Sequence, residues 1–131
     1  MLGRTSKHWW GVVIDAPDPL ALAHFYADLM DWEIVKTEDN FVGIAPMGDH
    51  VEYFAFQRSP AYVPPVWPPE DGAQQMMLHL DIEVPDLEAA VAAATRAGAR
   101  VAGFQPQETV RVMLDPAGHP FCLYVDTSDQ G

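Results

Sequence analysis

The chain has 131 residues, of which 49% are hydrophobic and 20% charged, a composition that fits a folded domain of ordinary size and excludes an intrinsically disordered chain. Its 19 acidic and 7 basic side chains give a formal net charge of −12, which disfavours nucleic acid as a partner because phosphate backbones would be repelled. No apolar run approaches the roughly 20 residues that span a bilayer, so we expect no membrane partner. The N-terminus has no apolar signal-peptide core and the single Cys122 has no internal disulfide partner, so we expect a cytoplasmic protein.

One sequence pattern occurs twice, about half a chain length apart. Residues 12–18 read Val-Val-Ile-Asp-Ala-Pro-Asp, and residues 80–86 read Leu-Asp-Ile-Glu-Val-Pro-Asp. Each copy is an alternating strand pattern, followed by Pro-Asp and then by helical spacing. An internal repeat predicts two similar modules, and because modules of this size are marginal alone, we expect them to share a core.

The first copy predicts a strand, a helix and three more strands. Residues 8–16 form the first strand, Asp18 suits the N-cap of the helix, and Pro19 suits its first turn. The apolar face of this helix comprises Leu22, Phe25, Tyr26, Leu29 and Met30. Asp31 is expected to end the helix in the left-handed conformation, where glycine is commoner. The remaining strands are predicted at 32–37, 41–46 and 51–57.

A proline-rich connector separates this copy from the second. Residues 59–74 include Pro60, Pro64, Pro65, Pro68 and Pro69, which deny hydrogen bonds to a sheet and stiffen the chain. Trp67 lies among them, so we expect the connector to pack on the body of the protein.

The second copy predicts the same order of elements. A strand is predicted at 75–84, a helix follows from the N-cap Asp86 to about Ala97, and Gly98 ends that helix. The last three strands are predicted at 100–104, 110–114 and 121–125, with a turn at 115–118.

Side-chain alternation divides each first strand between two faces. The apolar sets must face the helix of their module: Leu80, Ile82 and Val84 in the second copy, and Val12, Ile14 and Ala16 in the first. The opposite parity carries His79, Asp81 and Glu83 in the second copy, and Trp9, Gly11, Val13 and Asp15 in the first. We call the face turned away from the helix the far face; with these residues it is either wet or the lining of a ligand-binding cup.

Two further stretches resemble those of a known family. Residues 25–29, Phe-Tyr-Ala-Asp-Leu, and 31–34, Asp-Trp-Glu-Ile, are similar to the helix end of the vicinal oxygen chelate superfamily, with Asp31 in place of its glycine. Residues 115–122, Asp-Pro-Ala-Gly-His-Pro-Phe-Cys, are similar to the approach to its last strand. That superfamily contains glyoxalase I, the bleomycin-resistance proteins, the extradiol dioxygenases and the glyoxalase-like domain proteins.

The resemblance, which covers about residues 8–126, implies an α+β fold. Two βαβββ modules would form a cupped, half-barrel mixed sheet with the helices on the outside. The single domain would comprise module 1 (about 8–58), the connector (59–74) and module 2 (about 75–126). The resemblance also implies a homodimer.

Metal-binding members of the superfamily place one ligand on the first strand and one on the last strand of each module. By position these ligands correspond to Gly11 and Glu52 in module 1 and to His79 and Cys122 in module 2. Gly11 has no donor and Cys122 replaces a carboxylate, so the resemblance implies either no cofactor or one divalent ion (Zn, Ni, Fe or Mn) held by His79, Glu52 and Cys122. The alternatives are that Cys122 is a buried apolar residue and that His79 is hydrogen-bonded to Asp81.

We expect the protein to bind a small organic molecule, with cationic or aromatic compounds favoured by the acidic and aromatic residues of the cup. The expected ligand-binding residues are Trp9, Gly11, Val13, Phe54, Phe56, Trp67, Met77 and Tyr124. The second hypothesis is an enzyme of the lyase, isomerase or dioxygenase type, with His79, Asp81 and Glu52 as catalytic residues, acting with the metal or with His79 as general acid or base. The third is a mainly structural or partner-binding domain. Phe54, Phe56 and Trp67 have equally plain readings as core or packing residues.

Overall fold

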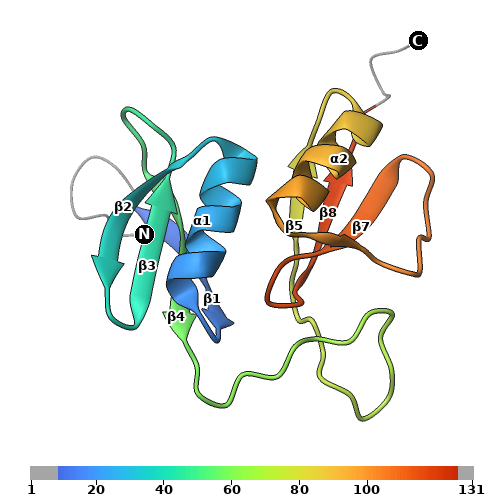
Figure 1. Ribbon diagram of the computed structural model, residues 1–131, viewed down its shortest axis with the longest axis horizontal. Helices are drawn as coiled ribbons and strands as arrows, with labels where there is room; N and C mark the ends of the chain where they lie inside the picture. Colours follow the sequence, from blue (N-terminus) through green and yellow to red (C-terminus); the bar gives the residue numbers. More distant parts are fainter. Residues whose placement is uncertain (1–8, 127–131) are drawn as a thin grey trace. The chain divides into compact units, whose positions relative to one another are not determined.

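The structure is a computed structural model that describes residues 9–126. The chain divides between Tyr62 and Val63 into two compact units, each with its own four-stranded sheet (Figure 1). The division falls within the proline-rich connector. None of the helices in the described residues is long and apolar enough to cross a membrane.

The first unit has the predicted βαβββ order. Its elements are β1 (Trp10–Ala16), α1 (Pro19–Met30), β2 (Glu33–Glu38), β3 (Phe41–Ala45) and β4 (Glu52–Arg58). The strand order in the sheet is β1-β4-β3-β2, with β1 parallel to β4 and the other pairs antiparallel. The predicted residue His8 lies outside the described residues.

The ends of α1 are formed as the sequence predicts. The Asp18 carboxylate accepts a hydrogen bond from the Ala21 amide at 3.2 Å, and Pro19 occupies the first turn. Asp31 ends the helix with a φ of 55°, in the left-handed region, and the Trp32 amide donates to the Ala27 carbonyl at 2.9 Å. Asp31 therefore adopts the left-handed conformation for which glycine is the usual residue at this position.

An aromatic core joins α1 to its sheet. Tyr26 of α1 stacks on Phe56 with ring centroids 5.6 Å apart and meets Phe54 at 5.1 Å. Both phenylalanines are buried, as is Leu22 on the same helix. The helix thus covers one face of the sheet (Figure 1) and leaves the opposite, far face to the alternate side chains of β1 and β4.

The second unit repeats the order. Its elements are β5 (Leu80–Glu83), α2 (Leu87–Ala97), β6 (Arg100–Val101), β7 (Val110–Leu114) and β8 (Pro120–Tyr124). The sheet order is β5-β8-β7-β6, and β5 is parallel to β8. The α+β class and the two βαβββ modules are therefore confirmed.

Two predicted strands are shorter than the sequence indicates. The strand expected at 100–104 ends at Val101, because the Gln105 side chain takes over the pairing: its amide group bonds the Val112 amide and carbonyl, both at 2.8 Å. The strand leading to Val84 begins only at Leu80, because Met77 has a φ of 65°, which a β-strand does not allow.

The connector packs on the second unit, as its tryptophan predicts. Trp67 packs against a cluster formed by Ala102, Val112 and Cys122 on the far face of the sheet. Pro64 lies against Gly118, so closely that a Cβ at Gly118 would stand 3.0 Å from the proline ring. Gly118 also has a φ of 93°, which the turn at 115–118 requires.

The two helix C-caps provide a stability test. Asp31→Gly is expected to raise the free energy of unfolding by a few tenths to about 1 kcal/mol, because a left-handed residue with a Cβ is strained. Gly98 has a φ of 122°, so Gly98→Ala is expected to lower it by roughly 1–2 kcal/mol. Urea denaturation followed by circular dichroism measures both changes.

Gly103→Ala is the matched control for these variants. A Cβ at Gly103 meets open space and its φ lies outside the left-handed region, so its substitution should change stability little. A loss at Gly103 as large as that at Gly98 would contradict the assignment of the effect to backbone conformation.

Candidate functional site

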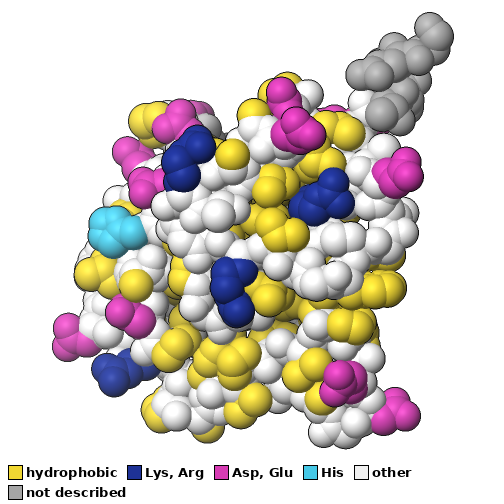
Figure 2. Space-filling view, turned by 45° about the vertical axis from the view of Figure 1, so that its right-hand side comes forward, with side chains coloured by type: hydrophobic (Ala, Val, Ile, Leu, Met, Phe, Trp, Pro, Cys, Tyr) yellow, Lys and Arg dark blue, Asp and Glu magenta, His cyan; other side chains and the backbone are white. Residues whose placement is uncertain are grey.

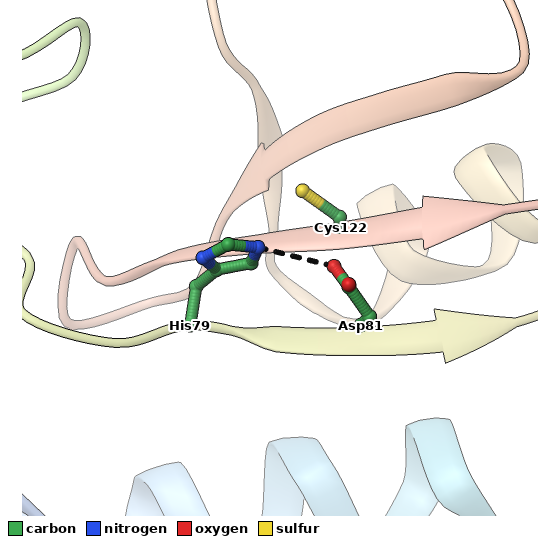
Figure 3. Close-up of side chains that lie close together, drawn as sticks. All are labelled: His79, Asp81 and Cys122. Atoms are coloured by element: carbon green, nitrogen blue, oxygen red, sulfur yellow. Dashed lines mark ion pairs between the residues drawn. The ribbon is translucent and has the colours of Figure 1, made fainter.

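Three side chains that can donate to a metal or a ligand lie together on the far face of the second sheet. Strands β5 and β8 run parallel with Asp81 paired to Cys122, and His79 lies two residues before Asp81 on the same face (Figure 3). The His79 Nε2 atom is 3.1 Å from the Asp81 carboxylate. One donor atom of each of the three residues lies within 4.8 Å of the others. The prediction that His79 is partnered by Asp81 is confirmed.

The three residues differ in exposure and in charge. The His79 and Asp81 side chains are 37% and 61% exposed, whereas Cys122 is 9% exposed. Burial, followed by the charge of Asp81 and a hydrogen bond from the thiol to that carboxylate, raises the pKa of Cys122 to about 11. The site therefore presents the exposed side chains of His79 and Asp81 beside a thiol that stays protonated at neutral pH.

An aromatic side chain borders this polar group. Trp67 packs on the cluster that contains Cys122, and its Nε1 donates a hydrogen bond to the Phe104 carbonyl at 3.0 Å. The Trp67 and Phe104 rings lie 6.1 Å apart between centroids. The far face of the second sheet thus passes from apolar at Trp67 to polar at His79, with Cys122 in between.

The far face of the first sheet is different. The ring of Tyr53 lies over Gly11, so that any Cβ at Gly11 would collide with it. Gly11 and Tyr53 are also paired in the register of β1 and β4. The position that resembles a first-strand metal ligand therefore has neither a donor nor room for one unless Tyr53 moves.

The expectation that Glu52 occupies in the first unit the position that Cys122 occupies in the second is wrong, as the strand pairing shows. Val12 pairs with Phe54 as Leu80 pairs with Phe121, which places Ala55, not Glu52, in the position of Cys122. Glu52 pairs instead with Trp10 at the start of β4. The count from Gly48 failed because the first unit reaches β4 by a longer approach than the Asp-Pro-Ala-Gly turn of the second.

The expectation that Phe54 and Phe56 line the ligand-binding face is wrong. The parallel pairing puts them on the helix side with Val12 and Ile14, where both are buried against Tyr26. They are core residues of the first unit and do not line its far face.

The other expected ligand-binding residues lie at several places. Val13 is exposed on β1, and Trp9 makes an edge contact with the His50 ring at 5.7 Å. Met77 is 84% exposed in the turn before β5. Tyr124 lies at the end of β8 beside Glu83, two residues beyond the pairing of Asp81 with Cys122. Cys122, in contrast, lies directly beside His79 and Asp81.

Sequence reasoning missed two residues of these surfaces. Tyr53 could have been found, because its neighbour Phe54 alternates with Phe56 and the intervening parity must face away from α1. Phe104 gave no signal, since it follows β6 in an irregular segment.

Figure 2 shows that Asp and Glu side chains are exposed at several places on the surface displayed, and that Lys and Arg side chains are exposed there as well. The net charge of −12 therefore indicates little about that face, and the local charge of the candidate site depends on its own residues.

Comparison with solved structures shows the same fold. An enzyme of the glyoxalase/bleomycin resistance protein/dioxygenase family from Burkholderia phytofirmans superposes with a TM-score of 0.63 at 20% identity, over 88% of this chain and 95% of that one. The fosfomycin resistance protein FosX from Mesorhizobium loti gives 0.65 at 11% identity, over 92% and 93% of the two chains. FosX from Listeria monocytogenes, whose structure contains Mn(II) and 1S,2S-dihydroxypropylphosphonic acid, gives 0.66 at 10% identity, over 92% and 90%. At these identities the likeness concerns the fold.

The sequence itself matches a family model. No curated protein matches the chain in sequence. The model of the glyoxalase-like domain matches residues 11–124, which include both β5 and β8 and nearly all of both units. The chain therefore belongs to the glyoxalase-like domain family, within the vicinal oxygen chelate superfamily.

Proposed function

We propose that this protein binds a small organic molecule at the far face of its second sheet, with His79 and Asp81 as the polar anchor. The observation that carries the proposal is the exposed 3.1 Å contact between these two side chains, directly beside Cys122 and the Trp67 cluster. Ligand sites combine an apolar wall with a few convergent polar groups, and this surface has both. FosX and the Burkholderia protein are similar in fold, which supports a small-molecule ligand without identifying it.

The polar anchor has complementary hydrogen-bonding capacity. A carboxylate only accepts hydrogen bonds, whereas an imidazole donates from one ring nitrogen and accepts at the other. Because the His79 Nε2 donates to the Asp81 carboxylate in their contact, Nδ1 is left as an acceptor. A ligand with a donor group can therefore bind Asp81, and a ligand with a donor group or an acidic proton can bind Nδ1 of His79.

The alternative is an enzyme. His79, Asp81 and Cys122 offer the nitrogen, oxygen and sulfur donors that zinc accepts, so the donor set fits a divalent ion with three protein ligands and an open position. Such an ion, when bound, would polarise an oxygen of the substrate. Without an ion, His79 held by Asp81 is the residue that can move a proton as general acid or base. Glu52 as a third ligand or catalytic residue, a homodimer and a cytoplasmic location stay predictions.

Metal analysis separates the metal-dependent enzyme from the two functions that need no metal. We expect protein purified without a histidine tag to carry divalent metal at a molar ratio well below one, because Gly11 offers no donor and the Cys122 thiol must lose a proton with a raised pKa to bind an ion. Stoichiometric zinc, nickel, iron or manganese that is lost in His79→Ala would instead support the metal-dependent enzyme.

Fragment binding tests the proposed function itself. Two-dimensional amide NMR of the full chain with a library of small fragments of all charges should show shifts concentrated at residues 79–81 and 122. Asp81→Asn should raise the Kd of fragments that bind there through a donor group by about tenfold, because it removes a charged acceptor.

Glu88→Gln is the matched control, since Glu88 is an exposed acid on α2, in the same unit but on the helix side of the sheet. It should leave those Kd values unchanged. A library that leaves the amides of residues 79–81 and 122 unshifted would remove the proposal.

The protonation state of Cys122 gives a further prediction. With a thiol pKa of about 11, the rate of alkylation by iodoacetamide should rise about tenfold per pH unit between about pH 8 and 10, because the thiolate is the nucleophile. Asp81→Asn should lower the pKa and accelerate the reaction at a given pH, since Asp81 contributes both charge and a hydrogen bond to the shift.

Cys122 is the single cysteine of the chain, so mass spectrometry gives the rate directly. Protein unfolded in guanidinium is the reference, with an ordinary thiol pKa near 9.0. If the alkylation rate of the folded protein stops rising at about pH 9 or below, the raised pKa of Cys122 is contradicted.

A further inference from the structure

The charged groups on the far face of the second sheet are unevenly distributed. Strand β5 carries Asp81 and Glu83 on this face, and Tyr124 is the β8 partner of Glu83. Arg111 has the opposite parity, since it pairs with the buried Leu123. Arg100 pairs with Leu114 and so shares the far face, but β7 and β8 separate it from β5, about 14 Å at ordinary strand spacing. The surface next to β5 therefore favours a positive charge.

The aromatic border of the same face is held in one orientation. The Trp67 indole N–H donates to the Phe104 carbonyl at 3.0 Å, and Trp67 packs against the cluster of Ala102, Val112 and Cys122. Trp67 is only half-buried and Phe104 is exposed, so part of this aromatic surface is open to solvent. A ring that is already fixed loses little entropy when a ligand stacks on it.

Cys122 connects the two parts. It belongs to the cluster on which Trp67 packs, and its Sγ lies within 4.8 Å of the Asp81 carboxylate. The aromatic and the acidic part of the face therefore meet at Cys122, where a flat ring system against Trp67 could carry a positive charge to Asp81.

We propose that this face binds planar aromatic cations, with the ring system against Trp67 and the positive charge at Asp81. The inference rests on the proposed function and adds the class of ligand and the role of Trp67 as a specificity residue. Cation–π attraction and a charge-assisted contact with the carboxylate both select this class over neutral or anionic aromatic compounds.

Three probes of similar flat shape and one non-aromatic cation test the ligand class with the full-length protein. The flat probes are N-methylquinolinium, neutral quinoline and anionic quinaldate, and the non-aromatic cation is tetraethylammonium. Titration calorimetry or NMR should give a Kd for N-methylquinolinium about tenfold or more below that of each other probe. Equal affinity for quinoline and N-methylquinolinium, or tighter binding of quinaldate, would overturn the inference.

Three variants assign the selectivity to residues. Asp81→Asn should weaken N-methylquinolinium by about tenfold and quinoline by less than about twofold. Trp67→Leu should weaken both aromatic probes by about fivefold and tetraethylammonium, which loses the cation–π attraction but no ring stacking, by less. Trp67→Phe keeps an aromatic ring and should stay within about threefold of the original protein, which keeps the test valid if the leucine variant does not fold. Glu88→Gln and Trp10→Leu, on α2 and in the first unit, are the controls and should change no Kd.

The outcomes distinguish this inference from the proposed function. If neutral or anionic fragments shift the amides of residues 79–81 while the cation does not bind, the face is a binding site but the ligand class is wrong. If Asp81→Asn weakens quinoline and N-methylquinolinium equally, the charge of Asp81 does not select the ligand and the inference falls. If no probe and no fragment binds, both proposals fall.

Discussion

The parallel pairing of the first and last strand in each unit determines which side chains can act together. In the second unit this register sets Asp81 beside Cys122, and alternation then brings His79 to the same face. In the first unit the same topology sets Val13 beside Ala55 and places Gly11 under the ring of Tyr53. A slip of one residue in either pair would reverse the faces and bury the polar set. The two halves of the repeat thus share a backbone plan while their far faces differ in chemistry.

Local spacing was enough to predict most of the fold. The N-caps Asp18 and Asp86, the C-caps Asp31 and Gly98, and the polar parity of β5 each depend on residues a few positions apart, and each is found in the structure. The errors arose where two distant strands must be aligned. Phe54 and Phe56 were expected on the ligand-binding face because the sequence does not show which residues of β1 and β4 pair. Once the pairing is known, both lie on the same face as Val12 and Ile14, which is the helix side. Glu52 was matched with Cys122 by counting from a glycine, which fails when the approaches to the two strands differ in length.

The connector is a structural part of the second unit, which the sequence indicated only by its aromatic residue. Helix α1 buries six of its residues, whereas α2 buries only Ala94. The second unit therefore obtains less of its buried area from its helix. Trp67 and Pro64 supply contacts from the opposite side, where they cover Ala102, Val112, Cys122 and the turn at Gly118. The place of Trp67 could not be predicted because it depends on how a segment without regular structure folds back on the sheet.

The exposed contact between His79 and Asp81 contributes little to stability, which is why it is informative about function. Exposed ion pairs are worth about 0–1 kcal/mol, and holding two side chains together costs conformational entropy. Asp81 moreover raises the pKa of the Cys122 thiol and keeps it neutral. The thiol therefore adds no ion pair to the contact between His79 and Asp81. A polar pair that neither fills the core nor caps a helix, on the face that also carries the Trp67 cluster, is compatible with the proposed ligand site. The chemistry of the protein is accordingly expected in the second unit, where these contacts lie.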